Sequence, residues 1–260
     1  MALGNSKNLR NDNTIFVDLK FAPNRGKEMV GFRQIVSKTP RENAKEGERK
    51  FDYAYQTFDY VEGEIVNFRV KDEPRFDDPN EKELMGYMTV RDVGETVGPD
   101  VVVRFPLLGQ AGRKLVGLIA AAVEARAGCV HIYTNFADVG AKLGDKVLDK
   151  PQAYINAKIG DARGEKLTPL YYGEDGKPLL KEDGTPMPLP MGEKVVVGRK
   201  EIWDFSKADN MVGQTALALV EHFRRDEQQH HDVAAGTEAD SDSGGDDDLD
   251  LEEAARAAMR

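Results

Sequence analysis

The order of strand-like and helix-like segments limits what this chain can fold into more than any other feature. Runs with the alternation and β-branched or aromatic content of strands, each bounded by Gly, Pro, Asn or Asp, dominate the first 200 residues. These runs are 14–21, 30–36, 51–61, 64–71, 84–91, 101–107, 129–136, 152–159 and 194–198. Only 112–127 and 206–225 have apolar residues at helical spacing, the first ending at Gly128 and the second starting at Ser206. The sequence therefore predicts a mainly β protein with two helices.

Between residues 61 and 159 three strands lead into one amphipathic helix, and two strands follow it. This is the element order of the OB-fold, a five-stranded Greek-key barrel that binds oligonucleotides. Gly63 is placed where a bulge could bend a long first strand. The same order also fits another small barrel or an α+β domain, and that alternative stays open.

The full prediction is one domain, 1–225, with an OB-fold-like barrel core at about 51–200. Extra strands precede the barrel, and a C-terminal helix follows it. Between residues 160 and 193, Glu-Asp-Gly-Lys-Pro at 174–178 recurs as Glu-Asp-Gly-Thr-Pro at 182–186. Asp-Gly followed by Pro is typical of turns, so this segment is predicted to be a β-hairpin arm.

Negative charge is concentrated at the C-terminal end. The chain has a formal net charge of −10, from 46 acids and 36 bases. Residues 226–260 hold twelve acids and two bases, so residues 1–225, with 34 of each, are neutral. The segment 226–260 has almost no aromatic or β-branched residues and is predicted to be a disordered acidic tail. The overall charge therefore does not exclude a nucleic-acid partner for the neutral body.

Signals for enzymatic chemistry are weak. Cys129 and His131 lie two apart on a predicted strand and could supply two metal ligands, but no further ligands accompany them. The loop from Gly109 to Lys114 joins a strand to a helix, as phosphate-binding loops do, but lacks their full spacing. We therefore predict no catalytic residue, no metal and no cofactor, and we keep an enzyme using these residues as a third hypothesis.

The single cysteine excludes an intramolecular disulfide, which predicts a reducing cytoplasm, that of the host if the protein is phage-encoded. The longest apolar stretch, 115–123, is about half as long as a membrane span requires, so no membrane segment is predicted.

Binding of single-stranded nucleic acid requires aromatic faces for stacking and cations along the backbone. The chain offers both over the predicted strands and loops, although a solvated basic surface would give the same pattern of cations. The candidate residues are Tyr53, Tyr55, Arg69, Lys71, Tyr87, Arg91, Arg104, Tyr133, Lys142, Lys146, Lys150, Tyr154 and Lys158.

With its barrel-like segment 61–159 and the tail sequence from Asp240 to Glu253, the chain resembles the acidic-tailed single-stranded DNA-binding proteins of bacteriophage replication systems. More distantly it resembles the bacterial single-stranded DNA-binding protein. The resemblance implies that the tail recruits replication and recombination proteins and competes with DNA for the cationic surface. It assigns these roles to Asp246, Asp247, Asp248 and Asp250. Tails of that family usually finish on an aromatic residue, whereas this sequence finishes on Met259 and Arg260, which leaves the tail's partner open.

We therefore expect a non-enzymatic protein, a homodimer being one candidate state, that coats and protects single-stranded DNA during replication, recombination and repair without sequence preference. The alternative is a structural or assembly protein of a virion with no affinity for nucleic acid.

Overall fold

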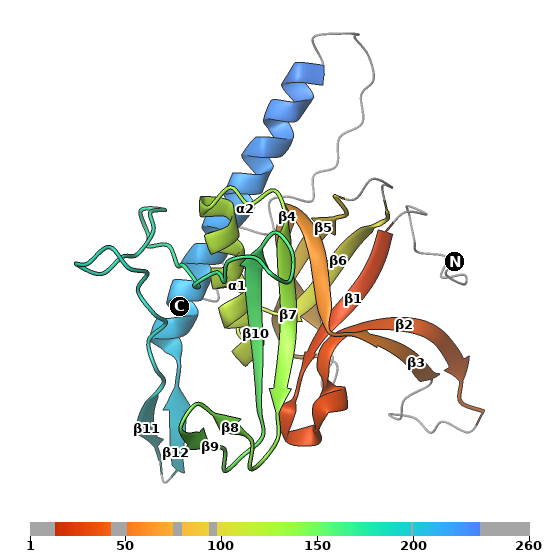
Figure 1. The fold of residues 1–260 in the computed structure, drawn as a ribbon, viewed down its shortest axis with the longest axis vertical. Helices are drawn as coiled ribbons and strands as arrows, with labels where there is room; N and C mark the ends of the chain where they lie inside the picture. The colour runs from red at the N-terminus through yellow and green to blue at the C-terminus, as the bar shows by residue number, and fades with distance from the viewer. Residues whose placement is uncertain (1–13, 43–50, 75–79, 94–97, 199, 235–260) are drawn as a thin grey trace.

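The computed structural model describes residues 14–42, 51–74, 80–93, 98–198 and 200–234, and strands hold more of them than helices do. The mainly β class is thereby confirmed. The elements are β1 (Thr14–Phe21), η1 (Pro23–Arg25), η2 (Lys27–Met29), β2 (Val30–Pro40), β3 (Phe51–Phe58), β4 (Tyr60–Pro74), β5 (Lys82–Arg91), β6 (Asp100–Pro106), α1 (Gln110–Glu124), β7 (Val130–Ala137), β8 (Lys142–Leu143), β9 (Lys146–Val147), β10 (Gln152–Ile159), β11 (Glu193–Val197), β12 (Lys200–Asp204) and α2 (Ser206–Ala234) (Figure 1).

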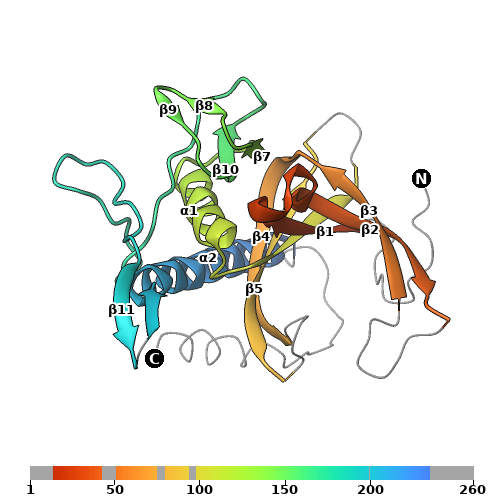
Figure 2. The ribbon, with the colours of Figure 1, turned by 90° about the horizontal axis from the view of Figure 1, so that it is seen from below.

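Eight strands form one curved sheet in the order β10-β7-β4-β5-β6-β1-β2-β3. Two antiparallel units, β1-β2-β3 and β4-β5-β6, are joined by the parallel pairing of β1 with β6, in which Asp18 lies opposite Arg104. The predicted N-terminal strands are therefore part of the main sheet. The β2-β3 hairpin forms the far end of the sheet and projects away from the helices (Figures 1 and 2).

Strand β4 changes partner at Gly63. Its first residues, up to Gly63, pair with β7, and the residues from Glu64 onward pair with β5. Gly63 has φ +150°, and a Cβ atom there would lie 2.2 Å from the carbonyl oxygen of Arg91. A side chain has no room at this bend. The irregularity in register that was predicted at Gly63 falls slightly later, between Ile65 and Asn67.

The five strands of the predicted barrel are β4, β5, β6, β7 and β10. A closed barrel of this order would place β6 beside β10. In the described residues β6 pairs with β1 instead, while α1 packs against β10 and α2. Closure into an OB-type barrel therefore stays a prediction.

The core lies between the inner face of the sheet and the two helices. Helix α1 is buried along most of its length because Leu115, Leu118 and Ile119 face the sheet and α2. The ring of Tyr171 packs on the backbone of α1 at Gly117, where a Cβ atom would lie 2.6 Å from the ring. Each fully buried aliphatic side chain of this core contributes about 1.5–3 kcal/mol of transfer free energy.

The predicted end of the C-terminal helix was wrong. The C-terminal helix was expected to end at Arg225, with disorder from Asp226, but α2 continues to Ala234. Glu227, Gln228 and Gln229 favour helix, and Asp226 pairs with His222 one turn earlier at 3.3 Å. The rest of the predicted tail, including Asp246, Asp247, Asp248 and Asp250, lies outside the described residues.

The segment 160–193 consists of two successive turns rather than one long hairpin. Asp175 Oδ1 accepts the backbone N–H of Lys177, and Asp183 Oδ1 accepts that of Thr185, so the two copies of the repeat fold alike. Each turn is followed by a single bridge to a proline, Pro178 or Pro186. Proline has no N–H group to extend a ladder, which explains why no long hairpin forms.

Among the described residues no helix is both long and apolar enough to cross a membrane.

Candidate nucleic-acid interface

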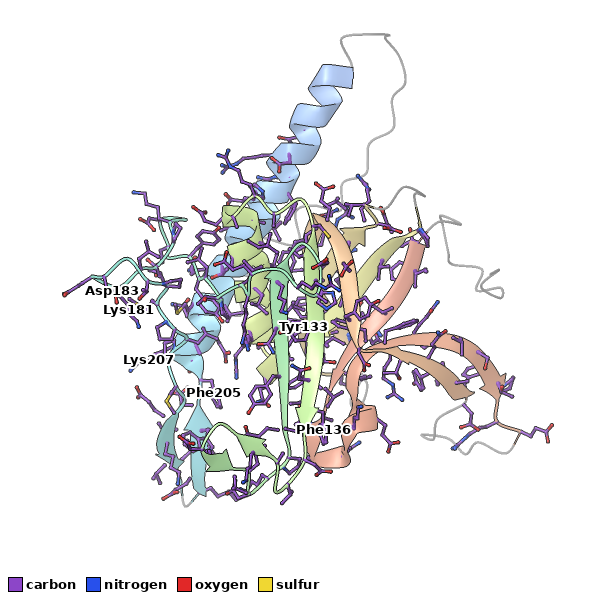
Figure 3. The ribbon with its side chains drawn as sticks, viewed as in Figure 1. Tyr133, Phe136, Lys181, Asp183, Phe205 and Lys207 are labelled. Atoms are coloured by element: carbon purple, nitrogen blue, oxygen red, sulfur yellow. The ribbon has the colours of Figure 1, made fainter. Side chains whose placement is uncertain are left out.

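Three rings line up across the outward face of β4 and β7. Tyr60 lies opposite Tyr133 in the ladder, and His131 lies between them with ring centroids 4.8 Å from Tyr60 and 5.4 Å from Tyr133. Tyr60 is 55% exposed. Figure 3 shows Tyr133 on this face of β7, which no helix covers. We call Tyr60, His131 and Tyr133 the aromatic strip.

Lysines from three segments surround the aromatic strip. On β10, Lys158 lies opposite His131, with its Nζ 5.9 Å from the ring centroid of Tyr133. Lys166 pairs through its backbone with Lys158. Lys114 reaches from α1 and donates a hydrogen bond to the buried Asn156, which lies opposite Tyr133. We call Lys114, Lys158 and Lys166 the lysine cluster.

The electrostatics of the cluster are those of a site that attracts an anion. Burial, and next the positive charge of Lys166, lower the pKa of Lys114 below its ordinary value of 10.5. Lys114 and Lys166 lie close enough that the charge of each disfavours the charge of the other. An anion placed beside them would offset part of this penalty.

Glu62 is the acid closest to the aromatic strip, and its Oε2 lies 2.6 Å from His131 Nδ1. This contact fixes the orientation of the imidazole. The described residues contain no group of three His, Cys, Asp or Glu side chains able to hold a metal. Cys129 donates to the carbonyl of Gly160, and burial, followed by the charge of Glu62, raises the pKa of its thiol. A thiol with a raised pKa is a poor nucleophile.

A second group of predicted residues crosses the sheet in one row. Arg69, Tyr87 and Arg104 are successive register partners on β4, β5 and β6. Arg104 Nε lies 2.7 Å from Asp18, its Nη1 lies 3.2 Å from Glu73, and Tyr87 also bonds to Glu73. Burial opposes the charge of Arg104, but these two carboxylates outweigh it and raise its pKa.

Arg104 is therefore held by acids of the sheet, and Arg91 is held in the same way by Asp100 at 3.3 Å. Lys71 is exposed on the same strand as Arg69. A role of this row in binding nucleic acid stays a prediction. The ion pair between Arg104 and Asp18 links β6 to β1.

The hairpin between β7 and β10 carries three of the predicted cations, Lys142, Lys146 and Lys150. All three are exposed, and no carboxylate of the described residues lies within ion-pair distance of them. Tyr154 is half-buried on β10, and its hydroxyl bonds to Gln152. Tyr154 shares β10 with Lys158, and the three lysines lie on the connection from β7 to β10.

Tyr53 and Tyr55 are not part of the aromatic strip. They lie on β3 at the far end of the sheet, in the hairpin that projects from the body. The predicted site is thus split between two surfaces, one on β4, β7 and β10 and one on β2 and β3.

The loop from Gly109 to Lys114 does not form a phosphate cradle. Its two cations point to other partners: Arg113 Nε lies 2.6 Å from Asp209 of α2, and Lys114 bonds to Asn156. Gly109 occupies the N-cap position of α1, but glycine has no side chain to accept a hydrogen bond from the first turn of the helix.

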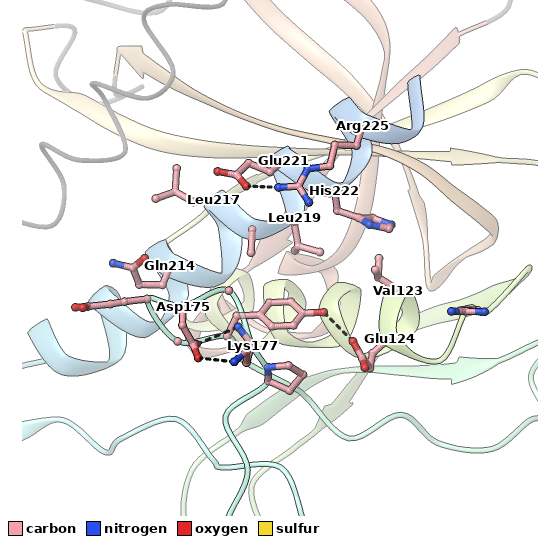
Figure 4. Close-up of a pocket in the computed structure, with 17 residues that line it drawn as sticks. Val123, Glu124, Asp175, Lys177, Gln214, Leu217, Leu219, Glu221, His222 and Arg225 are labelled. Atoms are coloured by element: carbon pink, nitrogen blue, oxygen red, sulfur yellow. Dashed lines mark hydrogen bonds and ion pairs between the residues drawn. The ribbon is translucent and has the colours of Figure 1, made fainter. Parts of the chain in front are cut away.

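A cavity of about 740 Å³ lies between the end of α1, the first Asp-Gly turn and α2 (Figure 4). Tyr172 donates to Glu124 there, and burial, with the charge of Glu124, raises the pKa of Tyr172 to about 12. Glu221 and Arg225 pair across one turn of α2. The acids that line the cavity are largely matched by bases. The cavity therefore lacks the excess of positive charge found at the lysine cluster.

Several residues of these surfaces were absent from the prediction. Tyr60 was grouped with a strand ending at residue 61, so its place beside Tyr133 was not recognised. Lys114 was assigned to a loop and helix, and Lys166 to a turn-rich segment. Only the folded structure brings these residues together, because no local pattern links α1, the segment after β10 and β4.

Comparisons with protein-family models, with curated proteins and with solved structures each found no match.

Proposed function

We propose that this protein binds single-stranded nucleic acid without sequence preference, through the aromatic strip and the lysine cluster. The observation that carries the proposal is the position of Tyr133, which has an exposed tyrosine on one side and Lys158 on the other. Bases stack on aromatic rings whatever their identity, and lysines neutralise phosphates along the strand.

The arrangement suits a single strand better than a duplex. Stacking on Tyr60 or Tyr133 requires bases that are free to turn outward, and paired bases are not. The positive charge in this region is modest because Glu62 contacts the aromatic strip. Affinity would therefore come from stacking as well as from charge.

We further propose that β4, β5, β6, β7 and β10 act as an OB-fold-like unit, with the β8-β9 hairpin and its three lysines beside the bound strand. The segment beyond Ala234 is proposed to be the acidic tail that recruits replication or recombination proteins and competes with DNA. Coating of exposed DNA strands is the activity that these parts would serve together.

The test is fluorescence anisotropy of a labelled oligonucleotide at several salt concentrations, with the full chain. The double variant Lys158→Gln/Lys166→Gln should bind more weakly, and the slope of log affinity against log salt should fall by about 1.4, or about 0.7 for each lost phosphate contact. Lys181→Gln is the matched control, because Lys181 lies on the arm, away from Tyr133 (Figure 3). Equal binding of single and double strands, or equal slopes for all three proteins, would refute the proposal.

A second candidate, a structural or assembly role, is favoured by the exposed apolar side chains of the β11-β12 hairpin. Val196, Val197, Ile202 and Trp203 are all exposed there. This role predicts oligomers that grow with protein concentration in light scattering, together with no affinity for nucleic acid.

A further inference from the structure

The β2-β3 hairpin carries a ladder of aromatic rings outside the five strands discussed above. Phe51, Tyr53 and Tyr55 alternate along β3 and so point to one side of it. The centroids of successive rings are 6.5 Å and 6.3 Å apart. Most residues of β3 are exposed, and Tyr55 is 37% exposed although no core contact requires a ring there.

Two cations of β2 lie over the ends of this ladder. The Nζ of Lys38 is 3.8 Å from the ring centroid of Phe51, and the guanidinium of Arg33 is 4.3 Å from that of Tyr55. The ring of Tyr53, between them, has no such cation among the described residues. A guanidinium stacked on a ring leaves its second face available to a nucleobase.

Arg33 lacks a strong acceptor. Its Nε–H is buried without a hydrogen-bond partner in the described part of the chain, and its Nη1 contacts only the sulfur of Met29, at 3.8 Å. The carboxylate of Asp18, opposite Arg33 in the ladder, is occupied by Arg104. The acid at the end of the hairpin, Asp52, is paired with Arg41 at 2.8 Å. A phosphate could accept charge-assisted hydrogen bonds from the terminal N–H groups of Arg33.

We propose that this hairpin, which we call the wing, is a second contact for the same nucleic acid strand. Bases stack on Tyr53 and on the Arg33–Tyr55 pair, while Arg33 and Lys38 contact phosphates. The inference rests on the proposed function, because it assigns the wing the ligand proposed for the aromatic strip. The wing lies at the opposite end of the sheet order from β10, so a strand needs more nucleotides to cover both surfaces than to cover the aromatic strip alone.

The experiment compares a short and a long oligothymidine, of about 8 and about 35 nucleotides, because one OB-type site covers about 4–16 nucleotides. The variant Tyr53→Ala/Tyr55→Ala is measured against the full chain, with Tyr53→Phe/Tyr55→Phe as the conservative control. Gln56→Ala, an exposed change on the opposite side of β3, is the matched control. Thermal unfolding of each variant checks that the fold is retained.

We expect the alanine variant to lose about 5-fold to 150-fold in affinity for the long strand for each lost stacked base, with little change for the short one. The phenylalanine variant and Gln56→Ala should bind as the full chain does. Photo-cross-linking of a bromouracil-substituted long strand should label the peptide that contains residues 51–58.

Unchanged affinity of the alanine variant for both lengths would overturn the wing contact while leaving the proposed function intact. A change in sedimentation of that variant, without a change in affinity, would also overturn it and would point to contact between two copies of the chain. Failure of the full chain to bind either oligonucleotide would refute the proposed function and the wing contact together.

Discussion

Lys114 of α1 and Asn156 of β10 are joined by a hydrogen bond of 3.2 Å, although 42 positions separate them in the chain. The bond places a half-buried ammonium group beside Tyr133, within the field of Lys166. A lysine in this position is disfavoured in its charged form, and the lowered pKa of Lys114 expresses that cost.

The first prediction concerns the pH dependence of binding. Phosphate should stabilise the charged form of Lys114, so binding should weaken as the pH rises through the lowered pKa, below 10.5. Lys114→Arg should abolish this pH dependence, because arginine stays protonated. Anisotropy titrations between pH 7 and pH 10 measure both. A full chain whose affinity is as independent of pH as that of Lys114→Arg would contradict the prediction.

The same shift has a consequence for stability. The folded state binds fewer protons at Lys114 than the unfolded state does between the lowered pKa and 10.5, so this group makes the protein more stable as the pH rises through that window. Lys114→Met removes both the cost of the half-buried charge and the hydrogen bond to Asn156, so it should lower the affinity for DNA with little net change in the unfolding temperature at pH 7. A clear loss of stability in this variant would show that the lysine has a structural role instead.

Arg104 is predicted to stabilise the sheet rather than to bind DNA. Arg104→Gln removes the ion pairs with Asp18 and Glu73, which are partly exposed, so the free energy of unfolding should fall by about 1 kcal/mol. Urea denaturation measures the loss. The affinity of this variant for single-stranded DNA should stay within about twofold of that of the unchanged chain. A large loss of affinity without a loss of stability would show that Arg104 contacts DNA.

The bend of β4 depends on a residue without a side chain. Gly63→Ala should lower the free energy of unfolding by at least about 2 kcal/mol, because the new methyl group would collide with the carbonyl of Arg91. Gly140→Ala is the control: Gly140 also has positive φ, at +82°, but has open space around it. Its cost should be about 1 kcal/mol, from the backbone alone. Similar losses for the two variants would argue against a steric cause at Gly63.

Thr215 ties the segment after β10 to α2 inside the core. Its buried hydroxyl accepts from the backbone N–H of Tyr172 at 3.0 Å and donates to the carbonyl of Met211 at 2.7 Å. Thr215→Val keeps the shape but leaves that N–H unpaired, so stability should fall by about 1–3 kcal/mol. Thr215→Ser, which keeps the hydroxyl, should lose less in the same denaturation experiment.

Removal of residues 235–260 should increase the affinity for single-stranded DNA. The truncation is placed after Ala234 because α2 continues to that residue. A negative segment attached near a cationic surface competes with phosphate, and the competition weakens as salt rises. The gain should be largest at low salt. If the truncated chain has unchanged affinity at every salt concentration, the tail does not compete with DNA.

The local pattern predicted the strands well where alternation was clear. The strands at 14–21 and 152–159 have the predicted bounds because apolar and polar residues alternate along most of their length. The predicted run 51–61 is in fact the end of one hairpin and the start of β4, separated at Asp59. Strand β12, with the sequence Lys-Glu-Ile-Trp-Asp, was missed because three of its five residues are charged.

Contacts between distant segments could not be predicted. Nothing in residues 14–21 indicates that their neighbour is β6, since a parallel pairing leaves no turn signal between its strands. The candidate site depended on such contacts as well. Tyr133 and Lys158 were predicted individually, but the positions of Tyr60, Lys114 and Lys166 beside them follow from strand pairing and helix packing.

The parallel joint between β1 and β6 also sets an order of folding events. During synthesis β1 leaves the ribosome well before its partner strand β6. Arg104 of β6 lies 86 positions after Asp18 of β1, with which it pairs. The hairpins β1-β2 and β2-β3 can form from neighbouring sequence, and so can β4-β5-β6, but the two units can join only once β6 has been made. Closing so long a loop is entropically costly and slow. Until then the edge of β1 that pairs with β6 is open, so β1 can pair with another molecule unless it is protected.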